Sequence, residues 1–260
     1  MLPVSFFNHM EEIKNLFQDR EPILFLDYDG TLTPIVATPD MAVISDEMRE
    51  QVSSLSKNRI VSIVSGRSVD DVRNKVGIGG IFYAGSHGFE ILSPRGEVTV
   101  NAQAEQIRKT IDEIWEKLAI RVGHINGALI ENVKYSVSCH YRLVADEDFS
   151  EFQKIVDETL SEYPRMMKCS GKKVFELRPK IDWGKGKAVE WILDYLQFDP
   201  DFQYPVYIGD DTTDEDAFMV LQNKGPGVLV ADPVRESAAR YVVHDVEDVK
   251  KVLEFFCSII

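Results

Sequence analysis

The 260-residue sequence is poor in cysteine and has no long apolar run. Its three cysteines, Cys139, Cys169 and Cys257, are an odd number without metal-site spacing, so we expect free thiols in a reducing compartment. No apolar stretch approaches the roughly 18 residues that a membrane-spanning helix needs. The N-terminal residues do not combine a basic segment with an apolar one, so no secretory signal is expected. These absences predict a cytoplasmic protein.

Positive charge is also scarce. There are 29 Lys and Arg residues against 43 Asp and Glu residues, which gives a net charge of −14. A surface this acidic repels the phosphates of nucleic acids and anionic lipids, so we expect neither nucleic acid nor a membrane as partner. The hydrophobic fraction of 44% is ordinary for a globular protein, and the length suits one large domain or two smaller ones. The sequence does not indicate an oligomeric state; a monomer is compatible with it.

The most informative stretch covers residues 22–34, P-I-L-F-L-D-Y-D-G-T-L-T-P. Ile23 to Leu26 form an unbroken apolar run, typical of a parallel strand buried on both faces. The run leads directly into Asp27 and Asp29, and reactive groups of open α/β sheets gather at the carboxyl ends of strands. Two carboxylates this close need a cation or a shared proton to offset their repulsion. The alternative is an aspartate that only caps a strand-to-helix turn.

Strands and helices alternate through most of the chain. Apolar strands are predicted over 60–64, 81–84, 206–208, 227–230 and 241–243, and helices over 6–17, 45–57 and 185–196. This alternation favours a parallel sheet with helices on both faces.

Residues 100–178 have a different pattern. Helices are predicted around 107–118 and 152–163, an alternating strand over 133–142, and a turn-interrupted strand pair over 166–178. Half-buried alternation of this kind is typical of an antiparallel sheet with one face covered by helices. The segment holds 12 Lys and Arg against 13 Asp and Glu, so nearly all of the net negative charge lies outside it. We therefore predict a Rossmann-like α/β core of residues 1–99 and 179–260 with an inserted α+β domain at 100–178.

The segment D-Y-D-G-T-L-T after a hydrophobic strand resembles the first motif of the haloacid-dehalogenase superfamily of phosphotransferases. The resemblance implies that Asp27 attacks phosphorus and that Asp29 acts as general acid and base. Phosphoryl transfer also needs hydrogen-bond donors and positive charge on the transferred group. Ser65, at the end of strand 60–64, offers a hydroxyl and a backbone N–H. Lys185, near a predicted helix start, offers an ammonium group beside the helix dipole.

Acidic residues at another strand end complete this set. Asp210 and Asp211 follow strand 206–208, and with Asp27 they form a carboxylate cluster that calls for a hard cation. Oxygen-only ligands and a phosphate partner favour Mg²⁺ over zinc. The resemblance implies that Mg²⁺ is bound by the Asp27 carboxylate, the Asp29 backbone carbonyl and Asp210, with Asp211 and Asp214 as supporting acids.

A closer resemblance, to trehalose-6-phosphate phosphatases, covers nearly the whole chain. Besides the first motif it rests on I-V-S-G-R, Y-A-G-S-H-G, I-E-N-V-K, S-C-H-Y-R, G-K-K-V-F-E-L-R-P, W-G-K-G-K-A and Y-I-G-D-D-T-T-D-E-D-A-F. It implies that the inserted domain is a cap that determines substrate specificity. The substrate-binding residues that it implies are Gly66, Arg67 and His87 in the core and Glu131, Lys134, Arg142, Lys172 and Glu176 in the cap.

One cap position departs from the family pattern. Relatives often place the lysine two residues after the glutamate, whereas Lys134 follows Glu131 by three. The two residues then have opposite strand parity, so a bulge or turn near Asn132 is needed. His87 and His140 each have the alternative of a purely structural role.

The resemblance thus implies an Mg²⁺-dependent phosphatase of trehalose biosynthesis that hydrolyses trehalose-6-phosphate to trehalose and phosphate through an aspartyl-phosphate. Two alternatives remain open. The substrate could be another sugar phosphate, such as sucrose-6-phosphate or a mannosyl- or glucosylglycerol-type phosphate, because specificity lies in the cap. The chain could also be a sensor that binds a phosphosugar without hydrolysis, although the complete set of Asp27, Asp29, Lys185 and Asp210 argues against it.

Overall fold

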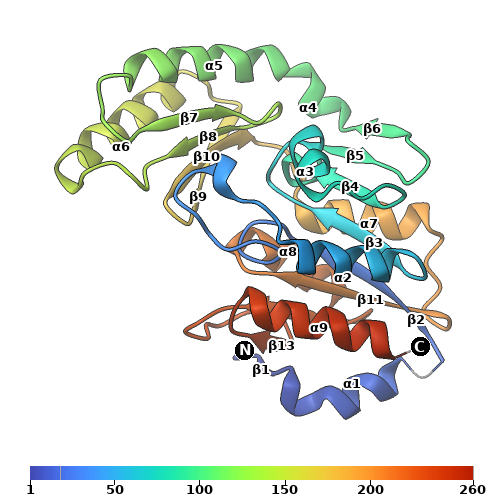
Figure 1. Cartoon of the computed structure of the whole chain (residues 1–260). Helices are drawn as coiled ribbons and strands as arrows, with labels where there is room; N and C mark the ends of the chain where they lie inside the picture. The colour runs from blue at the N-terminus through green and yellow to red at the C-terminus, as the bar shows by residue number, and fades with distance from the viewer. Residues whose placement is uncertain (18, 260) are drawn as a thin grey trace. The chain divides into compact units, whose positions relative to one another are not determined.

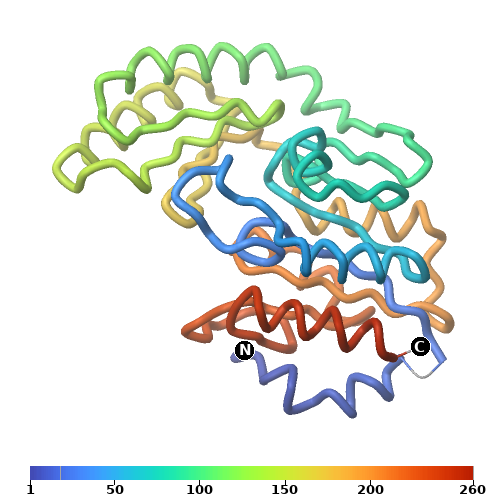
Figure 2. The backbone as a smooth tube through the Cα atoms, viewed as in Figure 1, coloured from blue at the N-terminus to red at the C-terminus, as the bar shows by residue number. Residues whose placement is uncertain are grey.

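The computed structural model describes residues 1–17 and 19–259, and the chain divides into two compact units. Unit 1 consists of Met1–Thr99 and Trp183–Ile260, and unit 2 consists of Val100–Asp182 (Figure 1). The chain leaves unit 1 once and returns to it once, so unit 2 is an insertion in unit 1 (Figure 2). Each unit has its own apolar core.

Unit 1 is built on a nine-stranded sheet in the described part of the chain, with strand order β1-β13-β12-β11-β2-β3-β4-β5-β6. In this order, each pair of neighbouring strands between β1 and β4 is parallel, and β5 runs antiparallel to β4. The strands are β1 Val4–Ser5, β2 Glu21–Leu26, β3 Ile60–Val64, β4 Phe82–Gly85, β5 Glu90–Leu92, β6 Val98–Val100, β11 Gln203–Gly209, β12 Gly227–Val230 and β13 Tyr241–Val243.

Strand β2 is buried on both faces, as the sequence predicts. Leu24 and Leu26 pack into one apolar cluster, and Ile23 and Phe25 pack into a second cluster on the opposite face. Burying side chains of this size stabilises the fold by roughly 1.5–3 kcal/mol each. The first cluster includes residues of α1 Met10–Leu16, α2 Asp46–Ser56, α3 Val69–Val76 and α9 Val246–Ser258, and the second includes residues of α7 Lys185–Tyr195 and α8 Glu215–Leu221.

The α/β class predicted from the sequence is therefore confirmed, with helices on both faces of a mainly parallel sheet (Figure 1). The predicted helix over 45–57 begins as expected, because the Ser45 hydroxyl accepts a hydrogen bond from the Met48 N–H at 3.1 Å and caps α2. Short 3-10 turns connect several elements: η1 Phe7–His9, η2 Pro39–Met41, η3 Ser86–Gly88 and η4 Thr212–Asp214.

Unit 2 contains a four-stranded antiparallel sheet with order β7-β8-β10-β9. One face of this sheet carries Ile130, Cys139 and Phe175, which pack against the unit 2 helices. The elements are α4 Ala102–Gln106, α5 Arg108–Arg121, β7 Leu129–Asn132, β8 Val137–His140, α6 Asp146–Ser161, β9 Met166–Gly171 and β10 Val174–Pro179. The antiparallel sheet and the strand pair predicted over 166–178 are confirmed.

The strand predicted over 133–142 is wrong in its extent. Residues 133–136 form a turn between β7 and β8, and Lys134 within it has a left-handed backbone with φ 69°. The Asn132 side-chain oxygen accepts a hydrogen bond from the Lys134 N–H at 2.9 Å, which is the local bond that lets asparagine start a turn. Arg142 follows the end of β8, and Lys172 lies in the turn between β9 and β10. The turn expected near Asn132 is therefore present, and Lys134, Arg142 and Lys172 all lie outside the strands.

In the described part of the chain, every helix is too short or too polar to span a lipid bilayer.

Candidate active site

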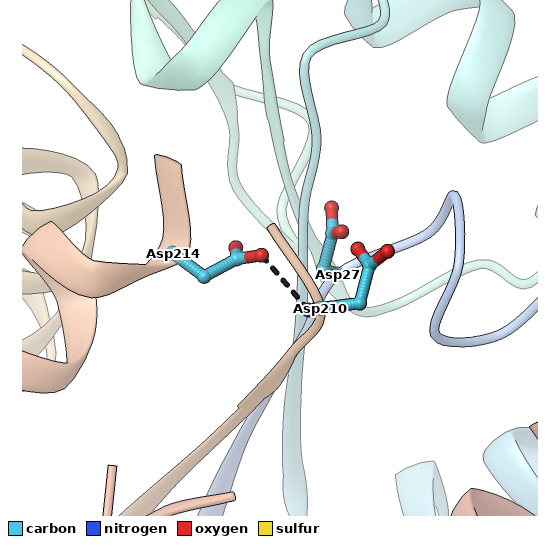
Figure 3. A group of neighbouring side chains, drawn as sticks. All are labelled: Asp27, Asp210 and Asp214. Carbon is cyan, nitrogen blue, oxygen red and sulfur yellow. Dashed lines mark hydrogen bonds between the residues drawn. The ribbon is translucent and has the colours of Figure 1, made fainter. Parts of the chain in front are cut away.

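Three buried carboxylates converge at the carboxyl ends of β2 and β11. One oxygen each from Asp27, Asp210 and Asp214 can be chosen so that all lie within 4.8 Å of one another. Strands β2 and β11 are paired in parallel, and the Asp27 N–H donates to the Ile208 carbonyl at 2.9 Å. Figure 3 shows the Asp27 and Asp210 carboxylates next to each other, with the Asp214 carboxylate turned toward the Asp210 backbone. Hydrogen bonding within the parallel sheet thus brings together acids separated by more than 180 residues.

Asp214 is held by protein donors on both of its oxygens. Oδ2 accepts from the backbone N–H groups of Asp210 at 3.0 Å and Asp211 at 2.9 Å. Oδ1 accepts from the Lys185 ammonium at 2.7 Å and from the Tyr207 hydroxyl at 2.6 Å. Four donors occupy this carboxylate, so it organises the site and leaves Asp27 and Asp210 as the carboxylates that can hold a cation.

Lys185 lies between two of these acids. Its Nζ is 2.9 Å from Asp27 Oδ1 and 2.7 Å from Asp214 Oδ1, and its side chain is only 3% exposed. Burial alone lowers the pKa of Lys185, but Asp214 and Asp27 outweigh burial and raise the pKa above its ordinary value. Lys185 is therefore a fixed cation at the start of α7, where the helix dipole also favours an anion.

Asp27 is a buried acid, and its surroundings disfavour its charged form. Burial raises its pKa well above the ordinary value, Lys185 lowers it, and Asp214 and Asp210 raise it again. Three carboxylates against one lysine leave an excess of negative charge. A hard divalent cation with oxygen ligands would remove that excess, so the donor set of Asp27 and Asp210 fits Mg²⁺.

Gly30 allows the close approach of Asp210. A Cβ atom at this position would lie 2.0 Å from Asp210 Oδ2, and the Gly30 backbone has φ +84°. Only glycine tolerates both the contact and the left-handed backbone without strain. The glycine of the D-x-D-G segment is thus what lets the loop after β2 pass beside the acid that follows β11.

We expect Gly30→Ala to lower kcat by at least ~10-fold, because the new methyl group must displace the Asp210 carboxylate. The matched control is Gly96→Ala, since Gly96 has nearly the same backbone (φ +86°) but no atom within 4 Å of the added Cβ. Both variants should lose stability from the strained backbone, by about 1 kcal/mol. Steady-state kinetics and urea unfolding of both proteins check this, and an equal kcat in the two variants would mean that the close approach of Gly30 and Asp210 has no effect on turnover.

A second part of the site follows β3 and β4. Ser65 is fully buried, its N–H donates to the Ala84 carbonyl at 2.8 Å, and its hydroxyl accepts from the Arg67 N–H at 3.1 Å. His87 lies against the same turn. Its N–H donates to the Ser65 carbonyl at 2.9 Å, and a Cβ on Gly66 would lie 3.0 Å from its Nε2. Ser65, Gly66 and His87 are therefore brought together at the ends of the neighbouring strands β3 and β4, and their roles stay predictions.

Arg67 is bonded to the predicted general acid. Its Nε donates to Asp29 Oδ2 at 2.7 Å and its Nη2 to Asp29 Oδ1 at 2.8 Å, while Nη1 donates to Asp71 at 2.7 Å. A further bond reaches the Pro39 carbonyl at 2.9 Å. Burial alone lowers the pKa of Arg67, but Asp29 and Asp71 outweigh it and raise the pKa. The guanidinium thus already has hydrogen-bond acceptors within the protein, and the substrate-binding role of Arg67 stays a prediction.

Asp211 has a local role in the backbone. Its carboxylate accepts from the Thr212 N–H at 2.7 Å, and with Asp214 it forms a capping box around η4. The capping box fixes the turn that brings Asp214 back to the end of the strand. The role of Asp211 as a supporting acid stays a prediction.

Comparison with known proteins identifies the family. The sequence model described as trehalose-phosphatase matches residues 25–247. A curated relative, "Probable trehalose-phosphate phosphatase D" of Arabidopsis thaliana, is 42% identical over 255 residues, which cover 94% of this chain and 69% of the relative. The chain belongs to the trehalose-phosphatase family. The predicted family and the predicted enzyme class, phosphoric monoester hydrolase, are therefore confirmed.

Solved structures agree on the fold of this trehalose-phosphatase family member. The C-terminal domain of the Candida albicans trehalose-6-phosphate phosphatase matches with a TM-score of 0.79 at 22% identity, covering 100% of this chain and 99% of that one. A haloacid dehalogenase-like hydrolase from Bacteroides thetaiotaomicron matches with a TM-score of 0.62 at 14% identity, covering 90% and 98% of the two chains. At these identities the matches show the fold alone, and they confirm the predicted α/β fold class, which the chain shares with the haloacid dehalogenase-like hydrolase.

The remaining predicted residues lie in unit 2. Glu131 and Glu176 both lie opposite Ser138, on the strands on either side of β8, so the three side chains share the face away from the apolar core. His140, on the same face, contacts Glu131 through Nε2 and Oε2 at 3.1 Å. The Arg142 Nη2 donates to the Lys172 carbonyl at 2.6 Å. Two of the five predicted cap residues are thus in one row of the sheet, and Lys134, Arg142 and Lys172 lie in turns or after strands.

Sequence reasoning missed Tyr207, Asp71 and Gly30 as parts of the site. Gly30 had a detectable signal, because a glycine directly after two acids at a strand end indicates a close approach of the backbone. Asp71 follows Arg67 at i+4, a spacing that favours an ion pair on a helix. Tyr207 lies in an apolar strand, and nothing in the sequence around it indicates that its hydroxyl contacts the site.

Proposed function

We propose that the protein hydrolyses trehalose-6-phosphate to trehalose and inorganic phosphate, with Mg²⁺ and through an aspartyl-phosphate on Asp27. The observation that carries the proposal is the buried contact of Lys185 with Asp27, set beside Asp210 in a chain of the trehalose-phosphatase family. A nucleophilic carboxylate, a fixed cation and a second carboxylate suited to a metal are the parts that phosphoryl transfer requires.

In the first step, an oxygen of Asp27 attacks phosphorus, and the bond between phosphorus and the sugar oxygen breaks. Lys185 and the Ser65 hydroxyl offset the negative charge on the phosphoryl oxygens. Asp29 gives a proton to the departing sugar oxygen. Because both Asp29 oxygens accept from Arg67 in this structure, the proposal requires one of them to turn away from Arg67 when substrate binds.

In the second step, water attacks phosphorus and gives a proton to Asp29. The bond to Asp27 breaks, which frees phosphate and restores the carboxylate. Asp27, Asp210 and the Asp29 backbone carbonyl would hold Mg²⁺, with Asp214 and Asp211 fixing the turn behind them. The cation supplies charge neutralisation between the carboxylates and the phosphate.

Residues that touch the sugar must determine which phosphate ester is used, since the residues around Asp27 recognise only the phosphoryl group. We assign this role to Glu131, Glu176, Lys134, Arg142 and Lys172 of unit 2, and a general substrate-binding role to Gly66, Arg67 and His87 of unit 1. Support comes from the row formed by Glu131, Ser138 and Glu176, because carboxylates and hydroxyls on one sheet face suit the hydroxyl groups of a disaccharide.

We expect Glu131→Ala and Glu176→Ala each to lower kcat/KM for trehalose-6-phosphate by at least ~10-fold. A sugar hydroxyl that loses its partner costs ~1–3 kcal/mol, and distant sugar contacts contribute to kcat as well as to KM. The same variants should hydrolyse p-nitrophenyl phosphate within about twofold of the original protein, because this small ester has no sugar. Steady-state kinetics on both substrates is the measurement.

The matched control for this experiment is Glu151→Ala. Glu151 contacts His124 at 3.0 Å, much as Glu131 contacts His140, but this pair lies at an exposed place on the helix side of unit 2. The control should leave both activities unchanged. Equal losses on the two substrates in the Glu131 and Glu176 variants would mean that these residues support folding, and the substrate assignment would be wrong.

A further inference from the structure

Tyr207 is a fully buried tyrosine whose hydroxyl reaches the candidate active site. Its ring lies in the apolar cluster beside α7 and α8, where it meets the ring of Phe218 edge-on with centroids 5.5 Å apart. The hydroxyl donates to Asp214 Oδ1 at 2.6 Å. The packed ring therefore fixes the direction from which this hydrogen bond comes.

The same oxygen of Asp214 also accepts from Lys185, which extends the contact to the nucleophile. Lys185 Nζ is 2.7 Å from Asp214 Oδ1 and 2.9 Å from Asp27 Oδ1. Tyr207, Asp214, Lys185 and Asp27 thus form a continuous chain of polar contacts, and each side chain in it is at most 5% exposed. Water has almost no access to replace a missing member.

We propose that Tyr207 is a positioning residue for phosphoryl transfer, which acts by sharing Asp214 Oδ1 with Lys185 and so holds the Lys185 ammonium within reach of Asp27. The proposal rests on the roles assigned above to Lys185 and Asp27. It does not depend on which sugar the substrate carries.

The physical reason is competition for one oxygen. Asp214 Oδ1 accepts from both Tyr207 and Lys185. Because Tyr207 takes part of the accepting capacity of this oxygen, the Lys185 ammonium stays in a position from which it also contacts Asp27. Without the Tyr207 hydroxyl, Oδ1 has only Lys185 as partner, and a buried carboxylate attracts its last donor more strongly. The ammonium then shifts toward Asp214 and away from Asp27, so it offsets less of the charge on the phosphoryl group.

The test is Tyr207→Phe, which removes the hydroxyl and keeps the ring. The matched control is Tyr83→Phe, because Tyr83 is 1% exposed and its hydroxyl donates to the Ile78 carbonyl at 2.6 Å, with no contact to the site. Both variants lose one buried hydrogen bond, so both should show a similar fall in Tm, about 2–8 °C. Assays are run at least about 20 °C below the lower Tm, so that both proteins are folded.

We expect Tyr207→Phe to lower kcat about 10- to 100-fold, the effect of one lost hydrogen bond to a charged group, with KM changed by less than about threefold. The loss should be the same for trehalose-6-phosphate and p-nitrophenyl phosphate, since the chain ends at the phosphoryl group. Tyr83→Phe should keep the original kcat. A kcat of Tyr207→Phe within about twofold of the Tyr83→Phe value would overturn the inference, as would a loss on only one substrate.

A failure of the proposed function can be distinguished from a failure of the Tyr207 proposal. An original protein that hydrolyses p-nitrophenyl phosphate but not trehalose-6-phosphate contradicts the substrate assignment, and the two tyrosine variants then decide on Tyr207 with the small ester. An original protein that hydrolyses neither ester overturns both proposals.

Discussion

Asp27→Asn should lower kcat by at least about 10³-fold while the protein remains folded. The change keeps the size of the side chain and removes the negative oxygen that attacks phosphorus. Asp27 is 4% exposed and touches Lys185, so the amide replaces the carboxylate inside the same contacts. Because the lost group acts in the transition state, the loss should fall on kcat. Phosphate release at saturating substrate measures it.

The control for this prediction is Asp46→Asn, the same chemical change at an exposed position in the first turn of α2. It should retain the original kcat. If Asp27→Asn kept more than about a tenth of the original kcat, Asp27 could not be the nucleophile, and the proposed mechanism would be wrong.

Removal of divalent cations should abolish turnover, and added Mg²⁺ should restore it. Without a cation, the Asp27 and Asp210 carboxylates repel the incoming phosphate, and Lys185 alone cannot offset three acids. Asp210→Ala should raise the Mg²⁺ concentration needed for half-maximal activity at least ~10-fold, or eliminate activity. Activity is measured against Mg²⁺ concentration after treatment with EDTA.

Asp201→Ala is the matched control for Asp210→Ala, because Asp201 is an exposed aspartate just before the other end of β11. It should leave the Mg²⁺ dependence unchanged. Full activity of the original protein after exhaustive chelation would contradict the assignment of Asp27 and Asp210 to a metal.

The strand ends that carry Asp27, Ser65 and Asp210 could be predicted from the sequence for a physical reason. A strand buried on both faces must be apolar along its whole length, so the first acid or serine after the run marks its carboxyl end. Parallel pairing then brings these ends to one edge of the sheet. The insertion could be recognised in the same way, because a change from buried runs to alternating residues accompanies a change from a parallel to an antiparallel sheet.

Contacts that depend on the exact course of a turn could not be predicted. The spacing of Glu131 and Lys134 predicts a turn near Asn132, but it does not predict that this turn ends the strand or that Lys134 has a left-handed backbone. The Arg67 contact with Asp29 joins residues 38 positions apart. Tyr207 has the sequence environment of any core tyrosine, and only the η4 turn brings Asp214 to its hydroxyl.

In the proposed reaction this chain removes phosphate from trehalose-6-phosphate with the help of a divalent cation. The most direct measurement is phosphate release by the original protein from a panel of trehalose-6-phosphate, sucrose-6-phosphate and mannosyl- and glucosylglycerol-type phosphates, with Mg²⁺ and with EDTA. We predict that kcat/KM is highest for trehalose-6-phosphate, by at least ~10-fold over each other ester, and that EDTA abolishes release. Faster hydrolysis of another sugar phosphate, or binding of trehalose-6-phosphate without any release of phosphate, would contradict the account.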